Sequence, residues 1–544
     1  MDQQSKTSAV AESYKKSFVW LFQSEWIQIP AALALYPVIH AVYASGASVR
    51  EHIYLTDIVS LSAFSDPEFP ICLLAMLAPL LLFRRRLNWS EFDSFGAARL
   101  AVGLLALLAA WSFALADYNY YYNFAHSVDR LALLGMAVLV FVHPVFLPTL
   151  ILWTLLMVHQ ADYPLGVAET ADKRLLFQLL ILTNTCLLVK IFTPVRSRTL
   201  LFLLSAMTAA NYYYPGLLKA ELSPNQHEWL YENQLANLAA AAYANGWFSW
   251  MDEQTVLSLL SRVSDWNFVL TLGTLLIEIG SIAWWTSRRL FVVGGLLHIA
   301  LHTGIAVFSG VIFWKWALIN IILMITVEIA TREDKLFSPL HFVAFGAVVY
   351  FSPHYFNPVR LGWFDSPLSN YYKFYAVSPD GKEFEIPNTF FAPYDIFFQQ
   401  SKFYYLGGNP LVGTYGGVRS YDFVKQLETL DSAAAVETMK AGRTARPIDE
   451  NRKAALGEFV NRYMTNFIYE GGSEPQWWQN LSFLRPPYHI YSSPRGPAFD
   501  GSQKVQSVVV RYIETLYLKS EIINVKQEDV MSIDMSHTLE QSQD

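Results

Sequence analysis

The chain has 544 residues, of which 53% are hydrophobic, 15% aromatic and only 16% charged, and its formal net charge is −7. Because soluble domains carry about 25% charged residues, this composition indicates a membrane protein. Apart from the run at 84–86 no basic cluster is present, which excludes nucleic acid as a partner. Cys72 and Cys186 lie in apolar runs, where a thiol behaves as a small hydrophobe. Two cysteines exclude a disulfide framework, although not a single bridge.

Within the polar N-terminal segment 1–26, residues 1–16 lack the apolar core and cleavage site of a signal peptide, so we expect the first apolar run to remain as a membrane anchor. Runs with the roughly 20 apolar residues of a membrane helix, or somewhat fewer, recur from residue 27 to residue 352. We predict spans at 27–44, 69–83, 98–117, 131–159, 175–192, 200–218, 268–285, 290–314, 316–331 and 337–351.

Two stretches of this region have an ambiguous path. The run 131–159 contains Pro144 and Pro148, so it is either one kinked span or two short helices. The stretch 220–265 is too polar to cross, and its tryptophans predict interfacial helices lying along the bilayer. Counting Lys and Arg in alternate loops places the N-terminus in the cytoplasm. The side on which the remainder of the chain lies depends on whether there are nine or ten spans.

Residues 353–544 contain no membrane-spanning run and predict a separate domain. The segments 371–377 and 383–386 flank a Ser-Pro-Asp-Gly turn and predict a hairpin. The apolar spacing predicts a helix at 456–469 and a strand at 508–525, with a polar surface excursion at 432–455. The predicted fold is an all-α polytopic membrane helical bundle of about nine or ten spans (27–352), followed by a C-terminal extramembrane α+β domain (353–544).

Ionisable residues inside the predicted spans are candidate site residues, because a charge near the bilayer centre costs at least ~2.5 kcal/mol. Glu278 lies near the middle of an apolar span and must therefore be neutral, paired or in a wet cavity. His298 and His302 are four residues apart on the next span, hence on one face. Such a pair can ligate a metal, but the sequence contains no other His-x-x-x-His, so we predict hydrogen-bonding histidines and no metal site.

Two aromatic clusters stand beside the spans. In the first, Pro215-Gly216 is expected to interrupt a span and Lys219 follows three tyrosines; a lysine in apolar surroundings loses proton affinity and can act as a base. The alternative is a lysine that anchors a span end to the headgroups. The second cluster, 117–123, is too polar for a plain interface belt, and the two clusters could meet across the bundle. The candidate residues of the two clusters are Tyr212, Tyr213 and Tyr214, and Asn119, Tyr120 and Tyr121.

The order Tyr213, Gly216, Leu217, Lys219, then Glu278 and then His298, resembles the horizontally transferred transmembrane domain family, whose best-known member is vitamin K-dependent gamma-carboxylase. The resemblance covers about residues 20–335, and the C-terminal region is similar to the domain that follows the membrane part in carboxylases. It implies a reduced, vitamin K-like quinone that Lys219 deprotonates in a dry cavity, where reaction with oxygen yields a base strong enough to activate a glutamate side chain for CO2 addition.

The resemblance also implies roles for individual residues. Lys219, Tyr213, Glu278 and His298 would be catalytic, and Asn119, Tyr120, Tyr121, Tyr212, Tyr214 and His302 would bind the substrate. Where the carboxylases have a histidine beside the second cluster, this chain has Tyr120, and a phenol titrates near 10. The resemblance therefore supports quinol binding better than carboxylation.

Three functions remain open from the sequence. The first is an integral-membrane enzyme with carboxylase-like or quinol-oxidising chemistry. The second is a transporter or lipid-binding protein with a central site around Glu278, and the third is a non-catalytic scaffold. The expected partners are the bilayer, a lipid-soluble small molecule, and a protein or peptide substrate at the C-terminal domain. There, His489 beside Tyr488 is expected at a strand surface.

Overall fold

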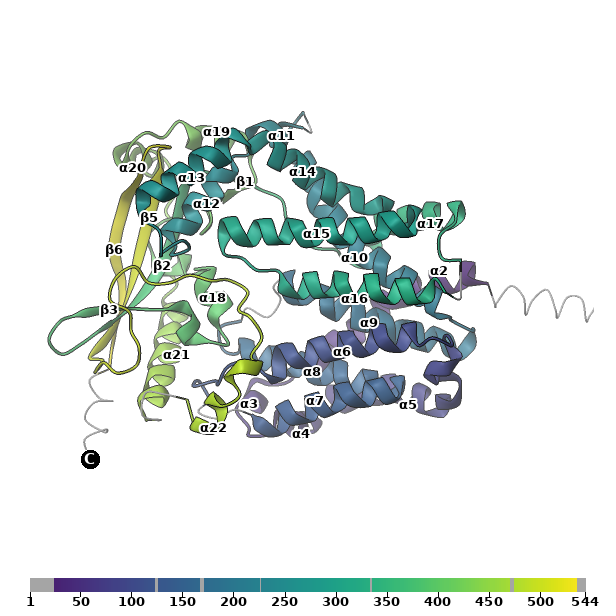
Figure 1. Ribbon diagram of the computed structural model, residues 1–544. Helices are drawn as coiled ribbons and strands as arrows, with labels where there is room; N and C mark the ends of the chain where they lie inside the picture. The colour runs from purple at the N-terminus through teal and green to yellow at the C-terminus, as the bar shows by residue number, and fades with distance from the viewer. Residues whose placement is uncertain are drawn as a thin grey trace, which may run out of the picture.

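A computed structural model describes residues 24–122, 126–166, 171–225, 227–332, 335–469 and 474–535. Long helices lie side by side in a bundle, and a small sheet with short helices covers one end of it (Figure 1). The predicted polar segment 1–26 lies almost wholly outside the described residues. The bundle consists of α2 (Glu25–Ala47), α5 (Glu68–Leu82), α6 (Ala97–Ala114), α7 (Ser127–Val142), α8 (Leu147–Asp162), α9 (Ala171–Phe192), α10 (Ser197–Glu221), α14 (Asn267–Gly280), α15 (Arg288–Ser309), α16 (Trp314–Ala330) and α17 (Pro339–Tyr350).

Every predicted span falls on one or two of these helices. Among the described residues, six helical segments are long and apolar enough to cross a membrane, or seven if the broken pair 59–65 and 68–82 forms one span. The run 131–159 is resolved as two helices, α7 and α8, separated at His143 and the 3-10 turn η4 (Pro144–Phe146).

The predicted interruption at Pro215-Gly216 is wrong, because α10 runs unbroken from Ser197 to Glu221. Proline removes one backbone donor but does not end the helix here. The role of Gly216 lies in packing, since a Cβ at this position would lie 2.8 Å from the Cβ of Glu278 on α14. The missing side chain lets the two helices approach closely.

The segment 220–265 forms α11 (Glu228–Glu232), α12 (Leu235–Ala244) and α13 (Glu253–Asp265). The helix α12 packs against the C-terminal sheet, and the prediction that this segment lies along a bilayer stays a prediction. Asn237 on α12 donates to the Asp365 carbonyl (2.8 Å), and the Arg495 guanidinium lies 3.6 Å from the centre of the Tyr243 ring. The polar composition of this segment reflects its contacts with the C-terminal region.

The larger sheet is antiparallel, in the order β3-β2-β5-β6. Its hairpin of β2 (Leu368–Val377) and β3 (Glu383–Ile386) confirms the predicted one. The predicted strand 508–525 is instead a second hairpin, β5 (Ser507–Tyr517) and β6 (Ile522–Asp534), because the chain turns at Lys519, which has a positive φ of 66°. A two-stranded sheet pairs β1 (Phe364–Asp365) with β4 (Gly417–Val418).

The predicted helix 456–469 is confirmed within α21 (Glu450–Tyr469). The predicted excursion 432–455 contains α20 (Ala433–Ala441), whose Lys440 is buried in an ion pair with Glu514. The other short helices are α3 (Glu51–Tyr54), α4 (Val59–Ser62), α18 (Asp395–Gln399), α19 (Tyr421–Glu428), α22 (Gln476–Gln479), η1 (Ala63–Ser65), η2 (Arg84–Leu87), η3 (Trp89–Glu91), η5 (Ser281–Thr286), η6 (Ser352–His354), η7 (Asn388–Phe391), η8 (Tyr404–Leu406) and η9 (Ser482–Leu484).

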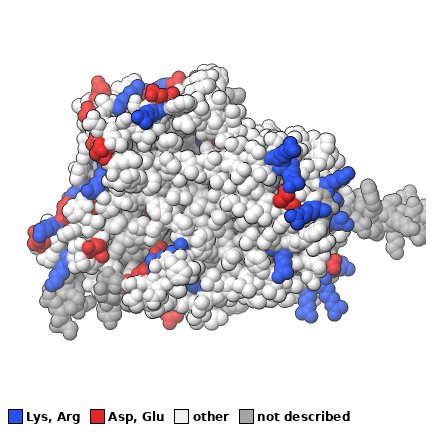
Figure 2. Space-filling model, viewed as in Figure 1, with Lys and Arg blue, Asp and Glu red and all other residues white. Residues whose placement is uncertain are grey.

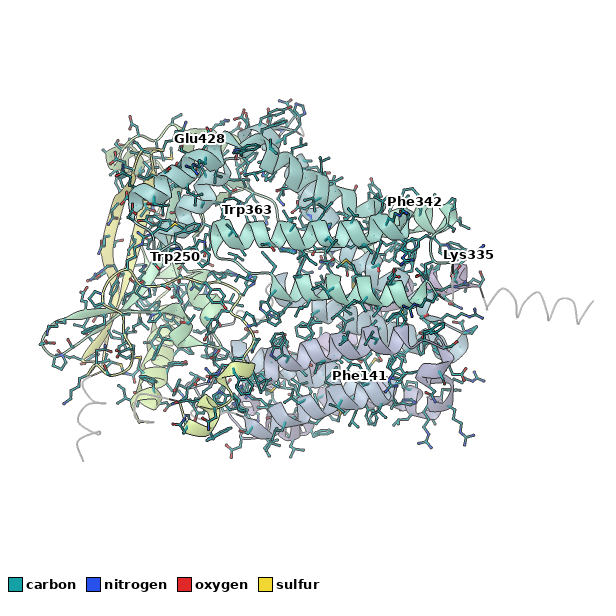
Figure 3. The ribbon with its side chains drawn as sticks, in the orientation of Figure 1. Phe141, Trp250, Lys335, Phe342, Trp363 and Glu428 are labelled. Carbon is teal, nitrogen blue, oxygen red and sulfur yellow. The ribbon has the colours of Figure 1, made fainter. Side chains whose placement is uncertain are left out.

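Basic side chains gather at the end of the bundle opposite the sheet (Figure 2). We call this the basic end. Lys335 and Phe342 lie there, whereas Trp250 and Glu428 lie toward the sheet end (Figure 3). Between the two ends the bundle presents exposed apolar side chains such as Leu131 and Leu276. The connections at the basic end and the first turns of α10 and α15 contain Arg84, Arg85, Arg86, Arg196, Arg198, Arg288, Arg289, Arg332 and Lys335.

Close packing inside the bundle can be tested at Gly103 of α6. A Cβ there would lie 2.3 Å from a ring carbon of Phe141, near the end of α7. Gly103→Ala must therefore displace this ring. We expect a loss of about 1–3 kcal/mol in the free energy of unfolding, measured as a lower melting temperature in detergent. Gly135→Ala on α7 is the control, because its Cβ would meet nothing within 4 Å. Equal melting temperatures for the two variants would contradict the tight α6–α7 contact.

Candidate functional site

One face of α10 faces α14, α15 and α16 and makes polar contacts with all three. Tyr212, Gly216 and Lys219 follow at intervals of four and three residues, so they share that face. Gly216 lets α14 approach α10 closely. The side chains of Tyr212 and Lys219, one turn away from Gly216 in either direction, contact different partners.

Lys219 forms an ion pair with Glu278. Its Nζ lies 2.6 Å from both carboxylate oxygens, and the side chains are 15% and 8% exposed. Of the three states that the sequence allowed for Glu278, the structure shows the paired one. The indole of Trp229 lies beside the ammonium, with its ring centre 5.6 Å from Nζ. A buried pair whose charges cancel is far less costly than either charge alone.

A second carboxylate near this pair is that of Asp365, on β1 of the two-stranded sheet. Asp365 accepts hydrogen bonds from Asn233 Nδ2 (2.9 Å) and Trp363 Nε1 (3.0 Å). Burial raises its pKa to about 6, although both hydrogen bonds and the charge of Lys219 act in the opposite direction. Asp365 is only 4% exposed, so this carboxyl is largely closed to water.

Two turns along α10, Tyr212 makes a buried cluster with both histidines of the His-x-x-x-His pair. Its hydroxyl accepts from Asn320 Nδ2 (2.7 Å) and lies 2.9 Å from His302 Nε2. The ring of His298 packs against the Tyr212 ring with centres 3.7 Å apart. The expectation that the histidines share one face and make hydrogen bonds is confirmed.

His298 also lies at the base of a groove on the outer surface of the bundle. Its Nδ1 is 2.7 Å from the Gly294 carbonyl and donates to it, so the buried Nε2 is an acceptor, and no described residue bonds to it. The groove measures about 110 Å³ and runs between α14, η5 and α15. It is lined by Leu276, Ile277, Gly280, Ala283, Trp284, Leu290, Val293, Gly294, Leu297 and His298.

Tyr213 and Tyr214 do not join this cluster. Successive helix residues point about 100° apart, and the Tyr214 hydroxyl donates to the Tyr350 carbonyl at the end of α17. The Tyr213 ring packs on Tyr214. Among the predicted catalytic residues, Lys219 and Glu278 are thus in contact, His298 joins Tyr212, and Tyr213 lies on another side of α10.

The second aromatic cluster does not meet the first across the bundle, which corrects that expectation. Asn119 Nδ2 donates to the Tyr394 hydroxyl (3.1 Å), and the Tyr120 ring packs on Tyr463 of α21. Tyr121 stacks on Phe459, also of α21. These residues join the bundle to the C-terminal region, a partner that helical periodicity cannot reveal.

A small polar pocket of about 90 Å³, which the sequence analysis missed, adjoins Asn119. It lies between the ends of several bundle helices and α18, and Asp395 of α18 lines it together with Lys173 and Lys315. Burial, aided by the charge of Asp117, raises the pKa of Asp395 to about 7 against the two lysines. In the sequence, the one signal of this pocket was the carboxylate of Asp395 within the aromatic run 390–398. The other residues that line the pocket come from distant segments of the chain, so the sequence could not show them together.

His489 also lines this pocket, and its predicted place at a strand surface is wrong. It is 6% exposed, and its Nδ1 lies 3.1 Å from the Ile312 carbonyl, because the neighbouring Ile490 pairs with Val311 in the loop before α16. Across the described ranges, no group of three or more His, Cys, Asp or Glu residues could hold a metal ion. Cys72 and Cys186 are both buried and free, so the single bridge is not formed.

Comparison with known proteins found no matching family model, no matching curated protein and no matching solved structure.

Proposed function

We propose that this chain is a multi-pass membrane enzyme that binds a lipid-soluble molecule with a hydroxylated ring, of the quinol class, in the groove above His298. In this proposal it belongs to the carboxylase-like family that its motifs resemble, and the Lys219–Glu278 pair accepts the proton. The observation that carries the proposal is the buried Nε2 of His298, an acceptor with no donor among the described residues, at the base of an apolar groove on the outer face of the bundle.

The chemistry of the groove supports a ligand of this class. A buried acceptor without a partner costs about 1–3 kcal/mol, and a ring hydroxyl donating to Nε2 would remove that cost. The walls, formed largely by leucine and valine side chains, glycines and the Trp284 indole, suit a flat ring with a hydrocarbon tail. The rim residues Leu276 and Val293 are 64% and 48% exposed, so the groove opens where lipid would surround the bundle.

The ion pair of Lys219 and Glu278 limits the way in which the lysine amine can act as a base. As paired, Lys219 already carries a proton, so a base role for its amine requires that proton to pass first to Glu278. Because the pair lies on the other side of α14 from the groove, the ring hydroxyl gives its proton first to His298 Nε2 in this proposal, and the amine takes the proton up at the end of the transfer. The pair then holds an ammonium beside a neutral acid, one proton richer. A reduced quinone, when bound, would supply that acidic hydroxyl. The transport alternative is less favoured, because the carboxylate of Glu278 is already occupied by Lys219.

The test is to plug the groove without disturbing the protein. A Cβ on Gly280 would meet nothing within 4 Å, so Gly280→Leu places its side chain in the groove. Gly273→Leu is the matched control, two turns earlier on the same helix and equally open. Mass spectrometry of copurifying lipids should show a quinone in the wild type and in Gly273→Leu. We expect at least about a tenfold loss in Gly280→Leu, which corresponds to about 1.4 kcal/mol. Equal retention in both variants, or no quinone in the wild type, would refute the proposal.

The positive charges at the basic end indicate how the bundle is oriented across the membrane. Short loops rich in Lys and Arg remain in the cytoplasm, so we propose that the basic end is cytoplasmic and that the sheet lies on the opposite side of the membrane. In intact cells a membrane-impermeant maleimide should then modify Ile448→Cys, an exposed site of the C-terminal region, without permeabilisation. Modification only after permeabilisation would reverse the orientation.

A further inference from the structure

The segment from Glu474 to Arg485 contains α22 and η9 and lies against the side of the bundle at its sheet end (Figure 1). Its only charged residues are the two at its ends, and residues 476–484 are all uncharged. The two end charges pair with each other, and Arg485 also bonds to Asp117 Oδ1 (2.8 Å) just after α6. The charges of the segment are therefore satisfied within the protein.

Further contacts set the level of this segment along the bundle. Trp111, in the last turn of α6, donates from Nε1 to the Leu484 carbonyl (2.7 Å). Arg130, in the first turn of α7, places its guanidinium 4.7 Å from the centre of the buried Trp478 ring. Arg130, 5% exposed, is thus buried under the segment. Both contacts place the segment beside the end of α6 and the start of α7, where the apolar surface of the bundle ends.

At this level the segment presents large apolar side chains outward. Phe483 is 80% exposed and Trp477 is 51% exposed, whereas their neighbour Trp478 is 5% exposed. Fully burying a phenylalanine side chain is worth about 1.5–3 kcal/mol, so leaving it in water forgoes that energy. Tryptophan favours the boundary between headgroups and hydrocarbon.

The surface directly beside the segment is also apolar. A groove of about 400 Å³ runs between α6, α7 and α16 and includes Trp111, the residue that bonds to Leu484. Its lining is Leu104, Leu107, Leu108, Trp111, Leu115, Leu134, Leu318, Ile321 and Ile322. The exposed face of segment 474–485 is therefore continuous with the apolar side of the bundle.

We propose that segment 474–485 is an interfacial anchor, which inserts Trp477 and Phe483 into the bilayer leaflet nearest the sheet and fixes the C-terminal region against the membrane. The partner is bilayer lipid. The inference rests on the membrane insertion of the proposed function, but not on a quinol or on Lys219. An outward tryptophan on a segment whose end charges are paired within the protein suits the boundary between headgroups and hydrocarbon.

A fluorescent probe that responds to polarity can locate this segment. The two native cysteines are buried, so Phe483→Cys can be labelled with a nitrobenzoxadiazole maleimide and reconstituted in phosphatidylcholine nanodiscs. Val138→Cys, 60% exposed within α7, is the control for bundle insertion, and Ile448→Cys, 49% exposed in the C-terminal region, is the control for water. Iodide in solution and doxyl spin labels near the top of the lipid chains serve as the two quenchers.

We expect the label at 483 to emit at shorter wavelength than the label at 448, to be quenched by the doxyl lipid and to be shielded from iodide. If 138 is shielded but 483 is quenched by iodide as strongly as 448, the anchor is refuted while the membrane proposal stands. If 138 is also open to iodide, the membrane insertion fails and the anchor fails with it. Retention of the quinone is measured separately and does not affect either outcome.

Discussion

Replacing Lys219 by methionine is expected to lower the free energy of unfolding by about 3–5 kcal/mol, because the change leaves the 8% exposed carboxylate of Glu278 buried and unpaired. The loss should appear as a lower melting temperature in nanodiscs. Adding Glu278→Gln to this variant should recover much of the loss, since the neutral amide no longer needs a counter-ion. The reason is local, because both carboxylate oxygens lie 2.6 Å from the one ammonium.

The control is an ion pair of the same chemistry at the surface. Lys425 pairs with Glu232 and Glu428, and these side chains are 25–36% exposed. Lys425→Met should cost no more than about 1 kcal/mol. A similar loss in both lysine variants would show that the Lys219 pair is as weak as an exposed one.

The same variant separates binding from chemistry. Glu278 packs toward α10, whereas its neighbours Ile277 and Gly280 line the groove on the other side of α14. Lys219→Met should therefore keep the quinone bound while losing turnover. Loss of the bound quinone from an otherwise folded Lys219→Met would instead place the ammonium in the binding site.

How far the sequence predicted the molecule depends on whether a feature is local. The run 98–117 needs only its own apolar residues to form a helix, and α6 begins and ends within a few residues of it. The hairpin at 371–386 and the shared face of His298 and His302 follow from a turn motif and from helical spacing. Both are decided by residues close together in the chain.

Features that need a distant partner could not be predicted. Spacing placed Glu278 inside a span but did not choose between a neutral, a paired and a hydrated carboxylate. Spacing left open whether the cluster of Asn119 meets the first one, and its partner, Tyr394, lies 275 residues away. The turn at Lys519 was missed because β-branched and aromatic residues lie on both sides of it, although the polar run 519–521 interrupts them. Helix and strand periodicity identify a buried face, not the element that covers it.

Asp395→Asn is expected to stabilise the protein at neutral and alkaline pH. Burial and the charge of Asp117 raise the pKa of this carboxyl from 3.8 to about 7, so the folded protein favours the protonated form. The stabilisation is complete below pH 3.8 and is lost as the pH rises through about 7. Because one pKa unit corresponds to 1.36 kcal/mol, the loss is at most on the order of 4 kcal/mol. Asparagine keeps the neutral state at every pH and should remove this dependence.

Melting temperatures of the wild type and Asp395→Asn between pH 4 and pH 8 test this expectation. The two curves should lie close together near pH 4 and separate up to about pH 7. Asp380→Asn is the control of opposite sign, because Lys382 and Ser378 lower the pKa of Asp380 to about 2, so this variant should gain nothing at pH 8. If Asp395→Asn is instead less stable than the wild type at pH 8, the ionised carboxylate is needed between Lys173 and Lys315. The polar pocket would then hold Asp395 as a working anion rather than as a neutral acid.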